Sequence, residues 1–154
     1  MKSLIALVTL ATLTTSTFAA TSGTLLLKGQ VSQVLSILVT PESIAATLPL
    51  DISQVDTKVA TVNEQSNSNT GYKVTISSSN LGSLKRTNGT QLFPYTLKYA
   101  GSAVNLAAPQ VFSNSSAASV NVNKNVTISY TGVPATQMVA GEYSDTVLFE
   151  IAAN

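Results

Sequence analysis

The feature that most constrains the fold is a two-residue alternation of apolar side chains close to the start of the chain. It runs through Gly23–Val31, where Leu25, Leu27 and Val31 occupy alternate positions, and it continues as far as Val39. A period of two is typical of a β-strand with one buried face. Chain ends are usually loose unless something holds them. An alternating apolar terminus therefore predicts a groove that receives it, either in its own fold or in a neighbouring molecule.

The residues before this segment have the composition of a secretion signal. Lys2 provides the charged start, an apolar run extends from Leu4 to Leu13, and small residues follow. The apolar run is shorter than the roughly 20 residues that span a bilayer. We predict a cleaved signal peptide over residues 1–19, an N-terminal extension over residues 20–33 and a folded domain over residues 34–154.

Composition excludes several classes of function. The chain has no cysteine and no histidine, only 10% of its residues are charged, and its formal net charge is +1. Nucleic-acid binders normally carry a basic stripe, which eight Lys and Arg scattered among seven acids do not supply. The usual catalytic bases and thiol nucleophiles are missing, and the acids are too scattered to propose a carboxylate pair or a metal cage. We expect a non-enzymatic protein with no catalytic residue, no cofactor, no metal and no nucleic-acid partner.

Alternating segments separated by turn signals occupy the rest of the chain. Tyr72–Ser77 predicts a half-buried strand, the pair Asn88-Gly89 predicts a tight hairpin turn, and a final strand is expected over residues 143–151. Seven or eight short strands indicate an all-β sandwich. The pattern further predicts a polar loop over residues 63–71 and two separate strands over residues 120–122 and 126–130.

Three aromatic residues share one face of the strand that follows the hairpin. Phe93, Tyr95 and Tyr99 have the spacing of core residues, and the alternative is a platform on which a sugar stacks. Pro94 lies between them and has no amide proton to donate. We therefore expect this strand at the edge of a sheet.

Two segments resemble the subunits of pili assembled by the chaperone/usher pathway. Gly23–Val31 is similar to the N-terminal extension of type 1-like major subunits, with a small residue, alternating apolar residues, a Lys-Gly pair and a further apolar residue. Ala140–Val147 is similar to the Gly-x-Tyr-x-Asp-Thr element that opens the last strand in many pilins and in the spore-coat-U-like group. Asn69–Val74 matches a common pilin segment more weakly. Many members have a cysteine near the position of Ser36, where this chain has none.

The resemblance implies an immunoglobulin-like sandwich that lacks its seventh strand and carries an N-terminal donor strand. In that family a strand of the periplasmic chaperone first fills the groove, and the extension of the next subunit then replaces it. Leu25, Leu27 and Val31 would be the side chains that enter apolar pockets. Gly29 would be the small residue that sets the register over a shallow part of the groove.

The acceptor groove would lie between the first and last strands of the folded domain. Residues of both strands would line it: Leu35, Ile37, Val39, Val147, Phe149 and Ile151.

These expectations together describe a structural pilus subunit, exported through the periplasm to the cell surface, that polymerises by donor-strand exchange for adhesion or biofilm formation. Its partners would be identical or related pilin subunits, the periplasmic chaperone, the outer-membrane usher and a receptor on a host or other surface. The alternative is a self-contained secreted β-sandwich that binds carbohydrate or matrix. In that case the N-terminal strand would belong to its own sheet.

Overall fold

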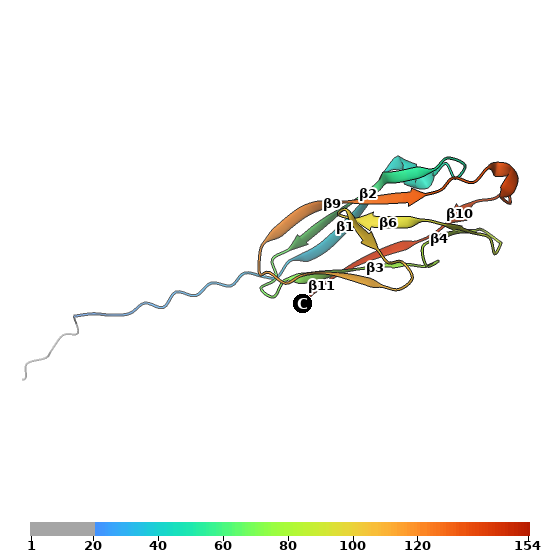
Figure 1. The fold of residues 1–154 in the computed structure, drawn as a ribbon. Helices are drawn as coiled ribbons and strands as arrows, with labels where there is room; N and C mark the ends of the chain where they lie inside the picture. The colour runs from blue at the N-terminus through green and yellow to red at the C-terminus, as the bar shows by residue number, and fades with distance from the viewer. Residues whose placement is uncertain (1–20) are drawn as a thin grey trace, which may run out of the picture. The chain divides into compact units, whose positions relative to one another are not determined.

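The computed structural model describes residues 21–154, and the predicted signal peptide, residues 1–19, lies outside the described residues. The chain divides into two units, a leading segment that ends at Val31 and a body, Ser32–Asn154, and each is described by itself. The body is an all-β sandwich of antiparallel sheets (Figure 1). The predicted fold class is confirmed at this level.

One layer of the body is a five-stranded sheet with the spatial order β1-β2-β9-β6-β7. The two longest strands pair with each other in its middle, with bulges near the start of β2. The strands are β1 (Leu35–Pro41), β2 (Gln54–Ser66), β9 (Val120–Tyr130), β6 (Thr96–Tyr99) and β7 (Ser102–Val104).

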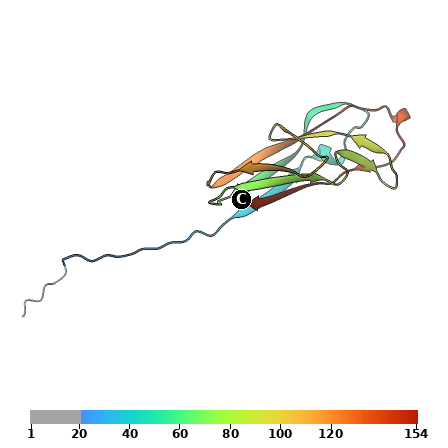
Figure 2. The ribbon, with the colours of Figure 1, turned by 60° about the horizontal axis from the view of Figure 1, so that its bottom comes forward.

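The opposite layer consists of two three-stranded sheets, in the orders β11-β3-β8 and β10-β4-β5 (Figure 2). The first contains β11 (Val147–Ala153), β3 (Tyr72–Ser78) and β8 (Gln110–Asn114). The second contains β10 (Tyr143–Ser144), β4 (Ser83–Arg86) and β5 (Leu92–Pro94). Two short 3-10 turns, η1 (Ser43–Ala46) and η2 (Ala135–Gln137), lie in the connections.

The core lies between the two layers and follows from the alternation in the sequence. Val62 on β2 and Val74 and Ile76 on β3 are almost completely buried, because every second side chain of a strand points to the same face. Two edge-on aromatic contacts, between Phe93 and Tyr130 and between Tyr99 and Phe112, add to the packing.

Two of the predicted boundaries are wrong, for one physical reason. The loop predicted over residues 63–71 begins only after Ser66, and residues 120–130 form one strand instead of two. Their polar residues lie on the outer face of a paired ladder, where the Asn63 amide donates to the side-chain oxygens of Asn121 and Asn123, both at 2.9 Å. A polar outer face therefore resembles a loop when only the composition is considered.

Two predicted strands are each divided between sheets: the final strand, residues 143–151, is interrupted at residues 145–146 between β10 and β11, and the strand after the hairpin is interrupted at Tyr95 between β5 and β6. The remaining local predictions are confirmed in part. The β3 strand covers the predicted Tyr72–Ser77. A hairpin joins β4 to β5 as predicted, but its loop is longer than the predicted tight turn, and Asn88, with a φ of 58°, is the member of the pair that has a positive φ. Pro94 ends β5, the edge strand of its sheet, so its missing donor leaves no gap in the ladder. Among residues 21–154, no helix is long and apolar enough to cross a bilayer.

Candidate functional site

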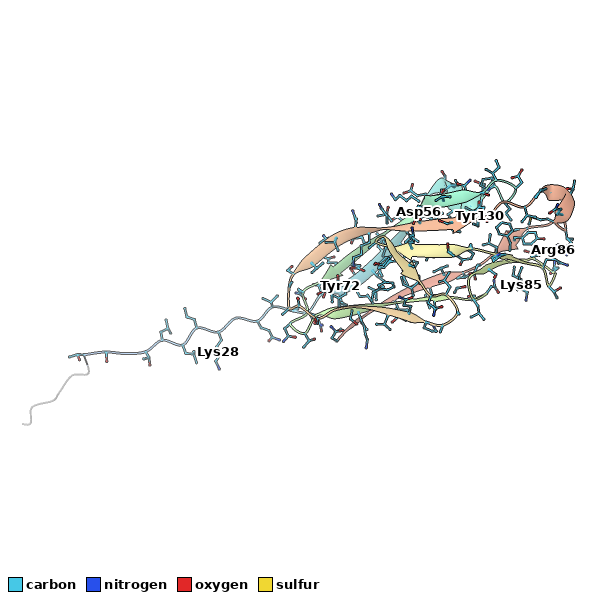
Figure 3. All side chains as sticks on the ribbon, viewed as in Figure 1. Lys28, Asp56, Tyr72, Lys85, Arg86 and Tyr130 are labelled. Atoms are coloured by element: carbon cyan, nitrogen blue, oxygen red, sulfur yellow. The ribbon has the colours of Figure 1, made fainter. Side chains whose placement is uncertain are left out.

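The leading segment that the sequence predicts as a donor is extended and exposed. No strand is assigned between Thr21 and Val34 (Figure 3). Leu25, Leu27 and Val31 are 82%, 81% and 85% exposed. A single extended segment cannot form a ladder by itself, so the alternating apolar residues of this segment do not belong to a paired strand within it. We refer to residues 23–31 as the arm.

Gly29 in the arm has no conformational or steric requirement that the described chain explains. A Cβ atom built on it would meet no atom within 4 Å, and its φ lies outside the left-handed range. The described residues would therefore accept a larger side chain there. If glycine is required at this position, a partner must impose the requirement.

The body has two unpaired sheet edges that lie side by side. The β1 strand is the last strand of the five-stranded sheet and pairs with β2, and β11 is the last strand of the opposite sheet and pairs with β3. The two strands lie next to each other, yet among residues 21–154 no ladder joins them (Figure 1). We refer to the facing edges of β1 and β11 as the open seam.

The two strands of the open seam run in opposite directions. The start of β1 and the end of β11 both lie at the loop that joins β2 to β3, because the Asn67 amide donates to the Val34 carbonyl oxygen at 3.1 Å and the Asn154 amide donates to the Gly71 carbonyl oxygen at 3.3 Å. An extended segment placed between the strands would therefore be antiparallel to one of them and parallel to the other.

The residues that the sequence predicts for the acceptor groove all belong to the open seam. Most of them are half-buried and pack against the core without being covered, whereas Val39 is 37% exposed. These apolar side chains are only partly covered, unlike those of the core behind them. The main-chain groups along the unpaired edges of β1 and β11 are available to pair with another strand. The half-buried residues are Leu35, Ile37, Val147, Phe149 and Ile151.

A charged group lies behind the open seam. Glu64, opposite Ile37 in the β1–β2 register, is fully buried. Its carboxylate accepts hydrogen bonds from the hydroxyls of Tyr72, at 2.7 Å, and Tyr99, and it pairs with the Lys124 ammonium group at 2.9 Å. Lys124 also lies over the Tyr99 ring, 5.3 Å from its centroid. Three donors compensate this buried charge, as a carboxylate removed from water requires.

Burial determines the ionisation of the two tyrosines. Loss of hydration, together with the hydrogen bond to Glu64, raises the pKa of Tyr72 to about 12. The same causes raise the pKa of Tyr99. Both hydroxyls therefore remain neutral donors at physiological pH. Tyr72 carries a label in Figure 3.

Asp145, in the segment Ala140–Val147, organises the start of the last strand. Its carboxylate accepts four hydrogen bonds, from the hydroxyls of Ser78 and Tyr95 at 2.5 and 2.6 Å and from the amides of Asn80 and Thr146 at 2.9 and 2.8 Å. These bonds join the turn after β3 to the residues just before β11. Asp145 therefore has a structural role, because it fixes where one strand of the open seam begins.

The aromatic residues of the alternative sugar platform are in the core. Phe93, Tyr95 and Tyr99 are 3%, 8% and 1% exposed, so their ring faces are not available to a sugar. The body also has a hollow of about 540 Å³ beside β5 and the end of β9, lined in part by Val55, Pro94 and Thr131. No charged side chain lines this hollow. Residues 21–154 also contain no group of three acids placed to hold a metal ion.

Neither comparison with known proteins identifies the family. No protein-family model matches the chain, and a search among curated proteins gives no match.

Sequence reasoning missed two residues at this site. Glu64 and Asn67 both fall within residues 63–71, which the sequence predicts as a loop, so the sequence pattern assigns neither of them a role. The signal was the alternation Val62, Glu64, Ser66, which places an acid at an inward position of a strand. An inward acid in a strand predicts a compensating network around it.

Proposed function

We propose that this protein is a structural, non-enzymatic subunit of a surface pilus. The arm of one copy is added as a strand to the open seam of the next. The observation that carries the proposal is the open seam: two adjacent strand edges without a ladder, each with a half-buried apolar row. The sandwich would then be immunoglobulin-like and complete only when a donor strand is present.

The dimensions of the two parts agree. The seam strands have seven residues each, and the arm has nine. At about 3.3 Å per residue, the arm is long enough to pair along the whole seam. Its odd positions would present Leu25, Leu27 and Val31 to the core, and each such side chain contributes about 1.5 to 3 kcal/mol on full burial.

Before assembly, the open seam would need another cover, because exposed strand edges promote aggregation. A periplasmic chaperone that supplies a strand, followed by an outer-membrane usher that exchanges it, would meet this need. Export through the periplasm and display at the cell surface for adhesion or biofilm formation follow from the same proposal. A receptor on a host or other surface would then be bound by the assembled fibre.

Two matched leucine substitutions in the arm test the proposal. Gly29→Leu adds a side chain on the face that enters the seam, and Gln30→Leu adds the same side chain on the opposite face. We expect Gly29→Leu to stop polymerisation of the purified mature protein, as seen by electron microscopy and size exclusion, and Gln30→Leu to leave it intact. Both variants should accept a synthetic peptide of residues 23–31 in their own seam.

Two results would contradict the proposal. One is equal polymerisation by Gly29→Leu and Gln30→Leu, because a donor strand cannot present both faces to the core. The other is a mature protein that remains a stable monomer at high concentration and binds no arm peptide. That result would favour the self-contained module.

A further inference from the structure

Asn67 fixes the backbone at the point where the arm joins the body. Its side-chain oxygen accepts a hydrogen bond from the Val34 amide at 2.6 Å, and its side-chain nitrogen donates to the Ser32 carbonyl oxygen at 2.9 Å. Its own amide donates to the Val34 carbonyl oxygen at 3.1 Å. These bonds extend the β1–β2 pairing beyond the first residue of β1, and they hold Ser32–Val34 extended.

This position matters because each copy carries both an arm and an open seam. An arm that filled the seam of its own copy would have to reverse direction and return along β1. A three-residue reversal centred on Gln33 would place Val31 opposite Leu35 and Leu27 opposite Val39. The apolar face of the arm would then cover β1, so this reversal would allow a subunit to complete itself.

A reversal centred within the arm would not place the apolar face of the arm on β1. Gly29 is the residue of the arm best suited to a turn, since glycine adopts positive φ without strain. A reversal centred on Gly29 would place Leu25 opposite Gln33, before β1 begins at Leu35. The leucines of the arm would then lie beyond the end of the seam. Only a reversal through Ser32–Val34 brings the whole arm onto β1.

We propose that Asn67 is a directing residue that disfavours this reversal and so keeps the open seam for the arm of a second copy. This inference rests on the proposed function. A hairpin loop of two or three residues cannot form at Ser32–Val34 while Ser32 and Val34 are hydrogen-bonded to Asn67. The sequence there also lacks the Gly, Asn or Asp that tight hairpin turns favour.

The direction of the arm distinguishes the two ways of filling the seam. A returning arm would be antiparallel to β1 and therefore parallel to β11, because the two seam strands run in opposite directions. An arm from a second copy can instead enter antiparallel to β11 and parallel to β1, so each way of filling the seam has one antiparallel and one parallel ladder. Asn67 therefore disfavours the conformation in which the arm returns along β1 of its own copy.

Engineered disulfides distinguish the two ways of filling the seam, because the chain contains no cysteine of its own. Leu27→Cys combined with Val39→Cys places the two thiols opposite each other when the arm returns onto its own β1. Cross-linked monomer is measured on a non-reducing gel, and the oligomer formed by arms of second copies, which run parallel to β1, is measured by size exclusion. The pair is introduced into the mature protein with the natural Asn67, into Asn67→Ala, and into Asn69→Ala, an exposed asparagine two residues away that serves as control.

We expect mainly oligomer and little cross-linked monomer with the natural Asn67 and with Asn69→Ala. In Asn67→Ala the ratio of cross-linked monomer to oligomer should rise about five-fold, the factor that corresponds to loss of one net hydrogen bond. Asn67→Asp keeps the acceptor for Val34 but loses the donor to Ser32, and we expect a smaller rise. This variant carries the test if Asn67→Ala does not fold.

The remaining outcomes separate the inference from the proposed function. Oligomer with an unchanged ratio in both Asn67 variants would overturn the role of Asn67 and leave pilus assembly standing. Cross-linked monomer as the main product with the natural Asn67 would also overturn that role. Absence of both cross-linked monomer and oligomer in every variant would overturn the proposed function itself.

Discussion

The sealed interior and the open seam are built from the same kind of strand but differ in how far their apolar rows are covered. Ile76 on β3 is fully buried, whereas Phe149, its partner in the register on β11, is only half-buried although it also packs on the core. The difference lies in the number of neighbours, because β3 lies between two strands and β11 has one. The apolar row of β11 is therefore left partly uncovered by the strands of the body, and a further strand could cover it.

The largest effect is expected from Glu64, the buried charge behind the seam. Glu64→Gln should lower the free energy of unfolding by about 3 to 5 kcal/mol, because the hydroxyls of Tyr72 and Tyr99 both lose a charged acceptor and the new amide group presents a buried donor to groups that also donate. Glu42→Gln is the matched control, since Glu42 pairs with Lys58 at the surface at 2.7 Å, where such pairs contribute about 0 to 1 kcal/mol. Urea unfolding measures both. Equal losses would show that the interior polar cluster does not differ from a surface pair.

The comparison between Ile76 and Phe149 can be tested directly. Ile76→Ala should cost about 3 kcal/mol in every state, because it leaves a cavity in a covered position. Phe149→Ala should cost about 1 kcal/mol in the unassembled protein, because part of the ring is already in contact with water. Addition of an arm peptide, residues 23–31, should raise the cost of Phe149→Ala and leave that of Ile76→Ala unchanged. If the peptide changes neither, the seam is not its binding site.

A smaller effect is expected from Asp145, which fixes the start of β11. Asp145→Asn should lower the free energy of unfolding by about 1 to 2 kcal/mol, because an amide retains one acceptor atom and loses the charge that strengthens all four hydrogen bonds. Asp51→Asn, at an exposed aspartate, should change it by less than about 0.5 kcal/mol. Thermal unfolding of the two variants measures the difference. Equal stability would mean that the seam edge does not depend on Asp145.

The smallest effect is expected from the titration of the tyrosines around Glu64, which takes place well above physiological pH. The pKa of Tyr72 is raised to about 12 in the folded protein, above its ordinary value of 10. The stabilisation is therefore fully present below about pH 10 and is lost as the pH rises from about 10 to about 12, because the unfolded chain ionises first. Urea unfolding over this range should show a decline that is less steep in Tyr72→Phe. An identical decline in both would exclude Tyr72 as its source.

The course of most strands could be predicted from the sequence because alternation is a local property. The alternation around Tyr72 and Ile76 predicts β3, and the Asn88-Gly89 pair predicts the hairpin between β4 and β5. Prediction failed where strands have polar outer faces. The residues around Asn63 and Asn121 read as loops, but they bond to each other across two paired strands that are far apart in the chain.

The candidate site divides in the same way. The apolar positions of β1 and β11 could be predicted from period two, and the arm is visible in the sequence as an alternating segment at a chain end. Glu64 and Asn67 could not be assigned, because their roles depend on partners that only the fold brings near: Tyr99 and Lys124 for Glu64, and Ser32 and Val34 for Asn67.

The sequence by itself determined which side chains share a face, since successive residues of any extended chain point to opposite sides. It also excluded thiol and imidazole chemistry, because the chain contains neither group. Only the tertiary structure decided which strand edges remain without a partner. Pairing depends on the order in which distant strands are placed in a sheet, and no local pattern in β1 or β11 records that the place between them is left open.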